Sequence, residues 1–156
     1  MHIGITGASG FLGQEIVDLA RLQGHRVIGF SRKQRAQIRG CHESRTFGPQ
    51  IDLRDIQAVV HLAGESILGA WTKAKRERIL RSRTDGTGWV VEAIKRAANK
   101  PEILVSASGA GIYGDRGEEI LTERAVRTPP IFSVRWLHSG NWKEGKSKPR
   151  EHGMWL

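Results

Sequence analysis

The chain has 156 residues, a hydrophobic content of 38% and a net charge of +9 at pH 7. This length provides for one domain with a single core. The lone cysteine, Cys41, excludes an internal disulfide, offers no metal-ligand spacing and fits a reducing compartment, so we expect a cytoplasmic protein without a metal site. The apolar opening, residues 1–8, is too short and too interrupted by glycine for a signal peptide or membrane span, so we expect no membrane association.

Positive charge is concentrated toward the end of the chain. Residues 124–156 carry 7 Lys/Arg against 2 Asp/Glu, whereas residues 1–123 carry 18 against 14. The cations follow no nucleic-acid-binding motif, so we expect no nucleic-acid partner. Residues 124–156 also contain three of the five tryptophans and have neither helical nor strand periodicity. We therefore predict a folded domain over residues 1–123 and a basic, Trp-rich tail over 124–156.

The chain opens with the pattern of a strand, a glycine turn and a helix. Residues 2–6 form a short apolar run with β-branched residues, and an amphipathic stretch then leads to Gly24, a usual helix stop signal. The apolar residues that recur at helical spacing in this stretch are Phe11, Leu12, Ile16, Leu19 and Ala20.

The remaining pattern predicts an α/β protein. Apolar runs at 26–30, 58–63 and 103–108 indicate three further strands, while residues 31–55 indicate only a poorly defined strand or loop. We expect one helix within 72–83 and a second over 87–98. Strands that alternate with helices form parallel βαβ units, so the fold class is a Rossmann-like, doubly wound parallel sheet that binds ligands at the carboxyl ends of its strands.

Gly7, Gly10 and Gly13 have the spacing of a dinucleotide-binding turn. The first glycine permits the tight bend, the second lets the backbone approach a pyrophosphate, and the third lets the helix pack closely on the strand. The pyrophosphate would lie at the helix N-terminus, where unpaired N–H groups and the positive end of the dipole favour an anion. An ordinary strand-to-helix turn is the structural alternative, but the position between a strand and a helix favours the cofactor.

The second strand is followed by Ser31, Arg32 and Lys33, where an acidic residue would bind the ribose hydroxyl of NAD(H). Cations favour a 2′-phosphate instead, because arginine can hold it with paired hydrogen bonds. We therefore expect NADP(H) in preference to NAD(H). The alternative is that Arg32 and Lys33 are merely solvated surface cations.

Five sequence blocks together point to a family: Thr-Gly-Ala-Ser-Gly-Phe-Leu-Gly at 6–13, Val-His-Leu-Ala-Gly-Glu-Ser-Ile at 60–67, Ser-Arg at 82–83, Ser-Ala-Ser at 106–108 and Tyr-Gly-Asp-Arg-Gly at 113–117. They resemble the atypical epimerase branch of the extended short-chain dehydrogenase/reductases, the YfcH-like NAD(P)-dependent epimerase/dehydratase proteins. The likeness runs from residue 1 to about 123. The candidate cofactor-binding residues are Thr6, Gly7, Gly10, Phe11, Leu12, Gly13, Ser31, Arg32, Lys33, Leu62, Ala63 and Gly64.

The resemblance also implies catalytic candidates. Ser108, or less readily Ser106, holds the position of the family's active-site Ser/Thr, and Tyr113 is the one tyrosine available as an acid. Extended members usually carry Tyr-x-x-x-Lys, in which the lysine lowers the pKa of the tyrosine. Here the fourth residue after Tyr113 is Gly117, so the lysine is missing.

His61 and Glu65 each have a structural and a functional interpretation. His61 ends a predicted buried strand, and a hydrogen-bonded strand-end histidine is favoured over a catalytic one because no partner carboxylate is in view. Glu65 could meet a substrate or cap the next element.

Family members continue well past this length, so the resemblance implies that part of the sheet and a C-terminal substrate domain are missing. The favoured function is an NADP(H)-binding epimerase-, dehydratase- or oxidoreductase-like domain; its intact relatives would act on a sugar-like or other small carbonyl substrate, whereas catalysis by this truncated chain is doubtful. The alternatives are a noncatalytic dinucleotide-sensing or interaction module and a fragment that folds poorly because an apolar edge is uncovered.

Overall fold

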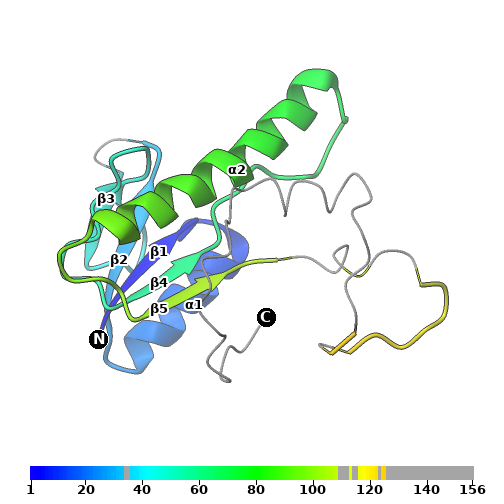
Figure 1. Ribbon diagram of the computed structural model, residues 1–156. Coiled ribbons are helices and arrows are strands. Elements are labelled where there is room, and N and C mark those ends of the chain that lie inside the picture. Colours follow the sequence, from blue (N-terminus) through cyan, green and yellow to red (C-terminus); the bar gives the residue numbers. More distant parts are fainter. Residues whose placement is uncertain (34–35, 109–112, 114–115, 123, 126–156) are drawn as a thin grey trace.

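The computed structural model describes residues 1–33, 36–108, 113, 116–122 and 124–125. Five parallel strands form one sheet in the order β3-β2-β1-β4-β5, with one helix after β1 and another after β4 (Figure 1). The strand order reverses at β1, as in Rossmann-like sheets, so the predicted fold class is confirmed. The elements are β1 (His2–Thr6), α1 (Phe11–Leu22), β2 (Arg26–Ser31), β3 (Glu43–Thr46), β4 (Ala58–His61), α2 (Lys73–Arg96) and β5 (Ile103–Ser106).

The two helices cover opposite faces of the sheet. Because successive strand residues point to opposite faces, neighbouring residues of one strand enter different core clusters. In β2, Val27 packs with Val17 and Ala20 of α1, whereas Ile28 packs with Val90 of α2. This double coverage explains why the strands are apolar runs rather than alternating ones.

Helix α1 packs on the sheet through small residues. Its buried positions are Gly13, Val17 and Ala20, whereas Phe11 and Leu19 are exposed. The buried side expected from apolar spacing is therefore only partly right, because close packing at Gly13 turns the helix so that larger residues face outward. The helix ends at Leu22, and Gly24 follows it as the predicted stop signal, with His25 N–H donating to Ala20 O and Gly24 N–H to Arg21 O.

The prediction of two helices between residues 72 and 98 is wrong, because Lys73–Arg96 is one continuous helix of 24 residues. Gly86 and Gly88 lie in its interior and do not break it. Gly86 is buried, and a Cβ there would lie 3.5 Å from the Phe47 ring, so tertiary packing outweighs the low helix propensity of glycine. At 1.5 Å per residue, α2 is about 36 Å long, and its N-terminal end extends past the sheet (Figure 1).

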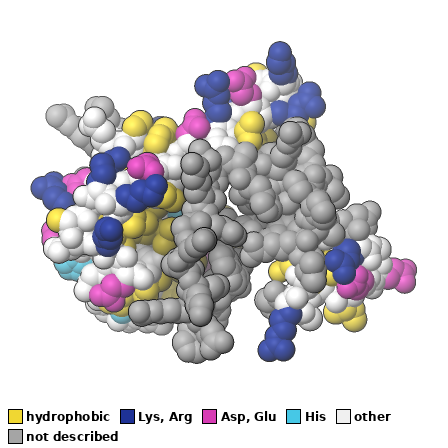
Figure 2. Space-filling view, in the orientation of Figure 1, with side chains coloured by type: hydrophobic (Ala, Val, Ile, Leu, Met, Phe, Trp, Pro, Cys, Tyr) yellow, Lys and Arg dark blue, Asp and Glu magenta, His cyan; other side chains and the backbone are white. Residues whose placement is uncertain are grey.

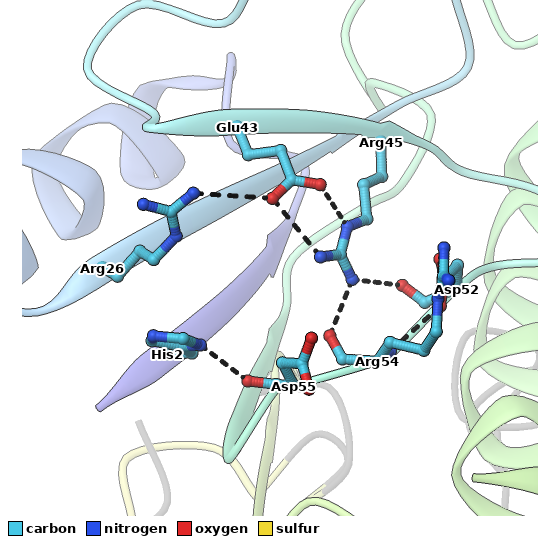
Figure 3. Close-up of polar contacts among 7 residues, drawn as sticks. All are labelled: His2, Arg26, Glu43, Arg45, Asp52, Arg54 and Asp55. Carbon is cyan, nitrogen blue, oxygen red and sulfur yellow. Dashed lines mark hydrogen bonds and ion pairs between the residues drawn. The ribbon is translucent and has the colours of Figure 1, made fainter.

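Strand β3 lies at the sheet edge within the weakly patterned stretch 31–55, and an arginine holds it in place. Arg45 Nε lies 2.7 Å from Glu43 Oε1, and Arg45 Nη1 donates to the carbonyls of Asp52 and Arg54 at 3.2 and 2.8 Å (Figure 3). The hydrogen bond from Arg45 lowers the pKa of Glu43. These contacts attach the edge strand to the turn before β4. The spacing of apolar residues could not have indicated this attachment, because it is made by polar groups.

Among the residues that the structure describes, no helix is both long enough and apolar enough to cross a membrane. The predicted tail, 124–156, lies outside the described residues apart from Arg124 and Ala125.

Gly24 and Gly88 give a matched test of backbone conformation. A Cβ would meet nothing within 4 Å at either position, but Gly24 has a φ of +76° and Gly88 is helical. We expect Gly24→Ala to lower the free energy of unfolding by about 1 kcal/mol through left-handed strain, and Gly88→Ala to raise it by about 1 kcal/mol through helix propensity. Urea denaturation measures both, and equal effects of the two variants would contradict this account.

Candidate functional site

The carboxyl ends of the five parallel strands meet at one edge of the sheet, and most candidate residues follow them. The glycine turn follows β1, residues 31–33 end and follow β2, residues 62–64 follow β4, and residues 107–108 follow β5. The pairing registers place one residue of each strand in a row just below this edge: Arg45, Phe30, Thr6, His61 and Ser106. The fold therefore brings together segments that are distant in sequence.

The glycine turn after β1 touches the backbone that follows β4. Gly7 has a φ of +72°, and a Cβ there would lie 2.9 Å from the Leu62 carbonyl carbon and 3.0 Å from Ala63 N. Gly10 N–H donates to Gly7 O at 2.9 Å and closes the turn. Gly13 is required for packing, because a Cβ there would overlap the Gly7 carbonyl oxygen. A side chain at Gly7 would push the turn away from Leu62 and Ala63, and one at Gly13 would push α1 away from the turn.

The N-terminus of α1 is suited to an anion. Gly10 is its N-cap, no side chain caps the first turn, and no acidic residue stands within that turn. By contrast, Thr72 caps α2 by accepting a hydrogen bond from Lys75 N–H at 3.2 Å. First-turn N–H groups without a side-chain acceptor favour an incoming phosphate. Phe11, 86% exposed, begins the helix beside this position.

A buried hydrogen-bond chain lies directly below the edge. Ala63 N–H donates to the Thr6 hydroxyl oxygen at 3.1 Å, and Leu62 N–H is shared between that oxygen at 3.2 Å and the Thr6 backbone carbonyl at 3.1 Å. The hydroxyl oxygen lies 2.7 Å from His61 Nδ1, and His61 Nε2 lies 3.2 Å from the Thr87 hydroxyl on α2. Because both lone pairs of Thr6 Oγ1 are used, its own proton goes to His61 Nδ1, which assigns the Nε2–H tautomer.

His61 is therefore a structural residue, as the sequence favoured. Its side chain is buried, and burial lowers its pKa from 6.5 to about 4. The neutral ring accepts from Thr6 and donates to Thr87, so both nitrogens are satisfied. A protonated ring would present a second N–H to Thr6, whose lone pairs are already occupied.

The cations after β2 are exposed. Lys33 N–H donates to Ser31 Oγ at 3.1 Å and forms a tight turn that carries Arg32 and Lys33 outward. No carboxylate stands among residues 31–33.

Glu65 contacts α2 through side chains but does not cap it, because Thr72 is the N-cap of this helix. Its carboxylate lies 3.2 Å from Lys75 Nζ, its N–H donates to Ser82 Oγ at 2.9 Å, and its carbonyl accepts from Arg83 Nη1 at 3.2 Å. The sequence blocks included Ser82 and Arg83 without giving them a role. Lys75 was not singled out by the sequence, because a lysine in a charged helix is usually solvated.

The serine candidates end or follow β5 at the same edge. Ser106 ends β5 and pairs in register with His61, while Ser108 is exposed two residues further on. Tyr113 is partly buried, and Gly117 has a φ of +58°.

Two cavities lie at the opposite, amino edge of the sheet. One of about 290 Å³ opens at the amino end of β4, between residues 51–55 and the end of α2. It has neither the glycine turn nor a helix N-terminus beside it, so we place the functional site at the carboxyl edge.

The family model for the NAD dependent epimerase/dehydratase family matches residues 3–135. The chain belongs to this family. Within it, the epimerase family protein YfhF of Bacillus subtilis is 34% identical over 153 residues, which are 94% of this chain and 50% of YfhF. The chain spans half or less of the length of such curated relatives.

Solved structures agree with the epimerase-type Rossmann fold. The human epimerase family protein SDR39U1, determined with NADPH, has a TM-score of 0.78 at 26% identity over 90% of this chain and 47% of its own. MoeE5, determined with UDP-glucuronic acid and NAD, has a TM-score of 0.69 at 24% identity, with coverage of 90% and 47%, and supports the fold alone.

The buried histidine predicts how stability depends on pH. A histidine whose pKa falls from 6.5 unfolded to about 4 folded stabilises the fold fully above pH 6.5, and this stability is lost as the pH falls toward 4. Between neutral pH and about pH 5 we expect a loss of about 2 kcal/mol from this residue. Urea denaturation across this range should give a shallower pH dependence for His61→Asn, which keeps an acceptor for Thr6 but does not titrate. Equal pH dependence in both proteins would contradict the burial of a neutral ring.

Proposed function

We propose that this chain binds NADP(H) across the carboxyl edge of its sheet, with the pyrophosphate at the N-terminus of α1. The observation that carries the proposal is the contact of the glycine turn with Leu62 and Ala63, together with a first turn of α1 that no side chain caps. Such an arrangement gives a phosphate N–H donors and close backbone approach. The family membership and the NADPH in the human relative support the same cofactor class.

The remaining cofactor-binding residues are assigned by their place on this edge. Gly7, Gly10 and Gly13 form the turn, and Phe11 and Leu12 begin the helix beside it. Thr6 acts from below by holding the backbone of 62–64. When bound, a nicotinamide dinucleotide supplies hydride transfer, and these residues bind and orient it.

The preference for NADP(H) rests on the turn after β2. Arg32 is exposed there, Ser31 is used to fix the turn, and Lys33 adds a second cation. A guanidinium can form paired, charge-assisted hydrogen bonds to a 2′-phosphate, whereas it gains little from a ribose hydroxyl.

Arg32→Asp tests this preference. We expect the dissociation constant for NADPH to rise about tenfold or more, because a charge-assisted hydrogen bond is replaced by repulsion, while the constant for NADH changes little. Calorimetric titration of the 156-residue chain with each cofactor measures both. Lys100→Asp makes the same charge change before β5, at the opposite edge, and should leave NADPH binding unaltered. Equal losses in the two variants would point to net charge rather than a phosphate contact.

Ser108 and Tyr113 are the catalytic candidates, for an unidentified sugar-like or other small carbonyl substrate. One observation favours a noncatalytic alternative, a dinucleotide-sensing or interaction module. Gly117, in a left-handed turn, stands where a lysine would lower the pKa of Tyr113. Without that cation, a tyrosine is a poor proton donor or acceptor near neutral pH.

We therefore expect the 156-residue chain to bind NADPH without oxidising it measurably when it is offered aldehydes, ketones and nucleotide sugars. The loss of NADPH absorbance measures turnover, and boiled protein gives the background. A rate that is abolished in Ser108→Ala or Tyr113→Phe would overturn this expectation and establish the enzyme.

A further inference from the structure

Residues 62–65, here called the post-β4 segment, are held from two sides. On the β1 side, Thr6 Oγ1 accepts the N–H groups of Leu62 and Ala63. On the α2 side, all three polar parts of Glu65 are engaged. Gly64 lies between these two attachments, so its backbone position depends on both.

The attachment to α2 involves five residues, here called the Glu65 cluster. Glu65 Oε1 lies 3.2 Å from Lys75 Nζ and 3.6 Å from Arg78 Nε. Its backbone N–H donates to Ser82 Oγ, which in turn donates to Ile79 O at 2.8 Å. Its carbonyl accepts from Arg83 Nη1, which also lies 3.2 Å from Ile79 O. The cluster consists of Glu65, Lys75, Arg78, Ser82 and Arg83.

The cluster is partly shielded from water. The side chains of Lys75 and Glu65 are 14% and 21% exposed, whereas those of Glu92 and Lys95 in the ion pair near the other end of α2 are 56% and 64% exposed. The hydrogen bond from Lys75 lowers the pKa of Glu65, so its carboxylate is charged at neutral pH. Shielding makes this pair a stronger constraint than a solvated surface pair.

The cluster also fixes where α2 lies. The N-terminal end of α2 extends past the sheet, and Lys and Arg side chains surround it (Figure 2). Over residues 73–85, Ile79 is the one buried position. At Gly64, a Cβ would lie 3.4 Å from the Arg83 guanidinium carbon, so this side chain packs along the segment.

We propose that Glu65 is a positioning residue that binds α2 to the post-β4 segment and thereby holds residues 62–64 in the conformation that receives the dinucleotide. This inference rests on the proposed function. Glu65 contributes through preorganisation: without its contacts, cofactor binding must order the segment and is weakened accordingly. Lys75 acts through Glu65 and has no separate part in binding.

Simple electrostatics predicts a different pattern, which makes the proposal testable. NADPH is an anion, so removing the negative charge of Glu65 would strengthen its binding, and removing the positive charge of Lys75 would weaken it. Positioning predicts that both changes weaken binding, by similar factors. It also predicts that the double variant is no worse than either single variant, because the two residues act as a unit.

The first measurement is amide hydrogen exchange in the 156-residue chain without ligand. We expect Glu65→Gln and Lys75→Met each to reduce protection of residues 62–65 by about tenfold, because the segment opens locally. Glu92→Gln is the matched control: it makes the same chemical change in the exposed pair with Lys95 and should leave this segment unaltered. Unchanged protection in both cluster variants overturns the proposal, whatever the chain binds.

The second measurement is the dissociation constant for NADPH. We expect a rise of about three- to tenfold in Glu65→Gln, in Lys75→Met and in the double variant, with no change in Glu92→Gln. Tighter binding in Glu65→Gln overturns positioning in favour of long-range charge. If the unmodified chain does not bind NADPH, the proposed function and the cofactor role of Glu65 both fail, while hydrogen exchange still decides whether the cluster holds the segment.

Discussion

The functional edge depends on the close approach of the glycine turn after β1 to the backbone after β4. At Gly7 there is no room for a Cβ against Leu62, and the Thr6 hydroxyl accepts the amides of Leu62 and Ala63 just below. Parallel pairing of β1 with β4 brings the two strand ends level, and these contacts then fix the loops beyond them. The row Thr6, His61, Thr87 extends the same constraint to α2. A single buried hydroxyl thus connects one loop, two strands and, through His61, a helix.

The two halves of helix α2 make different kinds of contact. Its C-terminal half buries Val90 and Ala93 against the sheet and supplies core. Its N-terminal half buries little apolar surface and is attached through the Glu65 cluster, in which the charged side chains bind specific partners. The charged sequence of this half is therefore consistent with its placement, since polar contacts accompany the single buried side chain, Ile79.

The sequence predicted what depends on local pattern. The strands at 2–6, 26–30 and 58–63, the end of α1 at Gly24 and the glycine turn were all found from apolar runs and glycine spacing. It failed where long-range packing decides: Gly86 is tolerated inside α2 because it faces Phe47, and Leu19 is exposed because Gly13 sets how α1 lies. Lys75 could not be distinguished from a solvated lysine, because its partner Glu65 lies ten residues away in a loop. The roles of Ser108 and Tyr113 follow from resemblance alone and stay predictions.

The hydrogen bonding of the edge also limits where an anion can be recognised. Leu62 and Ala63 direct their N–H groups inward to Thr6, so these two amides are not available to a phosphate. The first-turn N–H groups of α1, which no side chain caps, and the exposed cations Arg32 and Lys33 are donors of the described residues on this side. The proposed phosphate contacts therefore lie on the β1–β2 side of the edge, whereas the post-β4 segment would contribute shape. Under this proposal, the post-β4 segment has to be held firmly in position but does not have to present a charge to the cofactor.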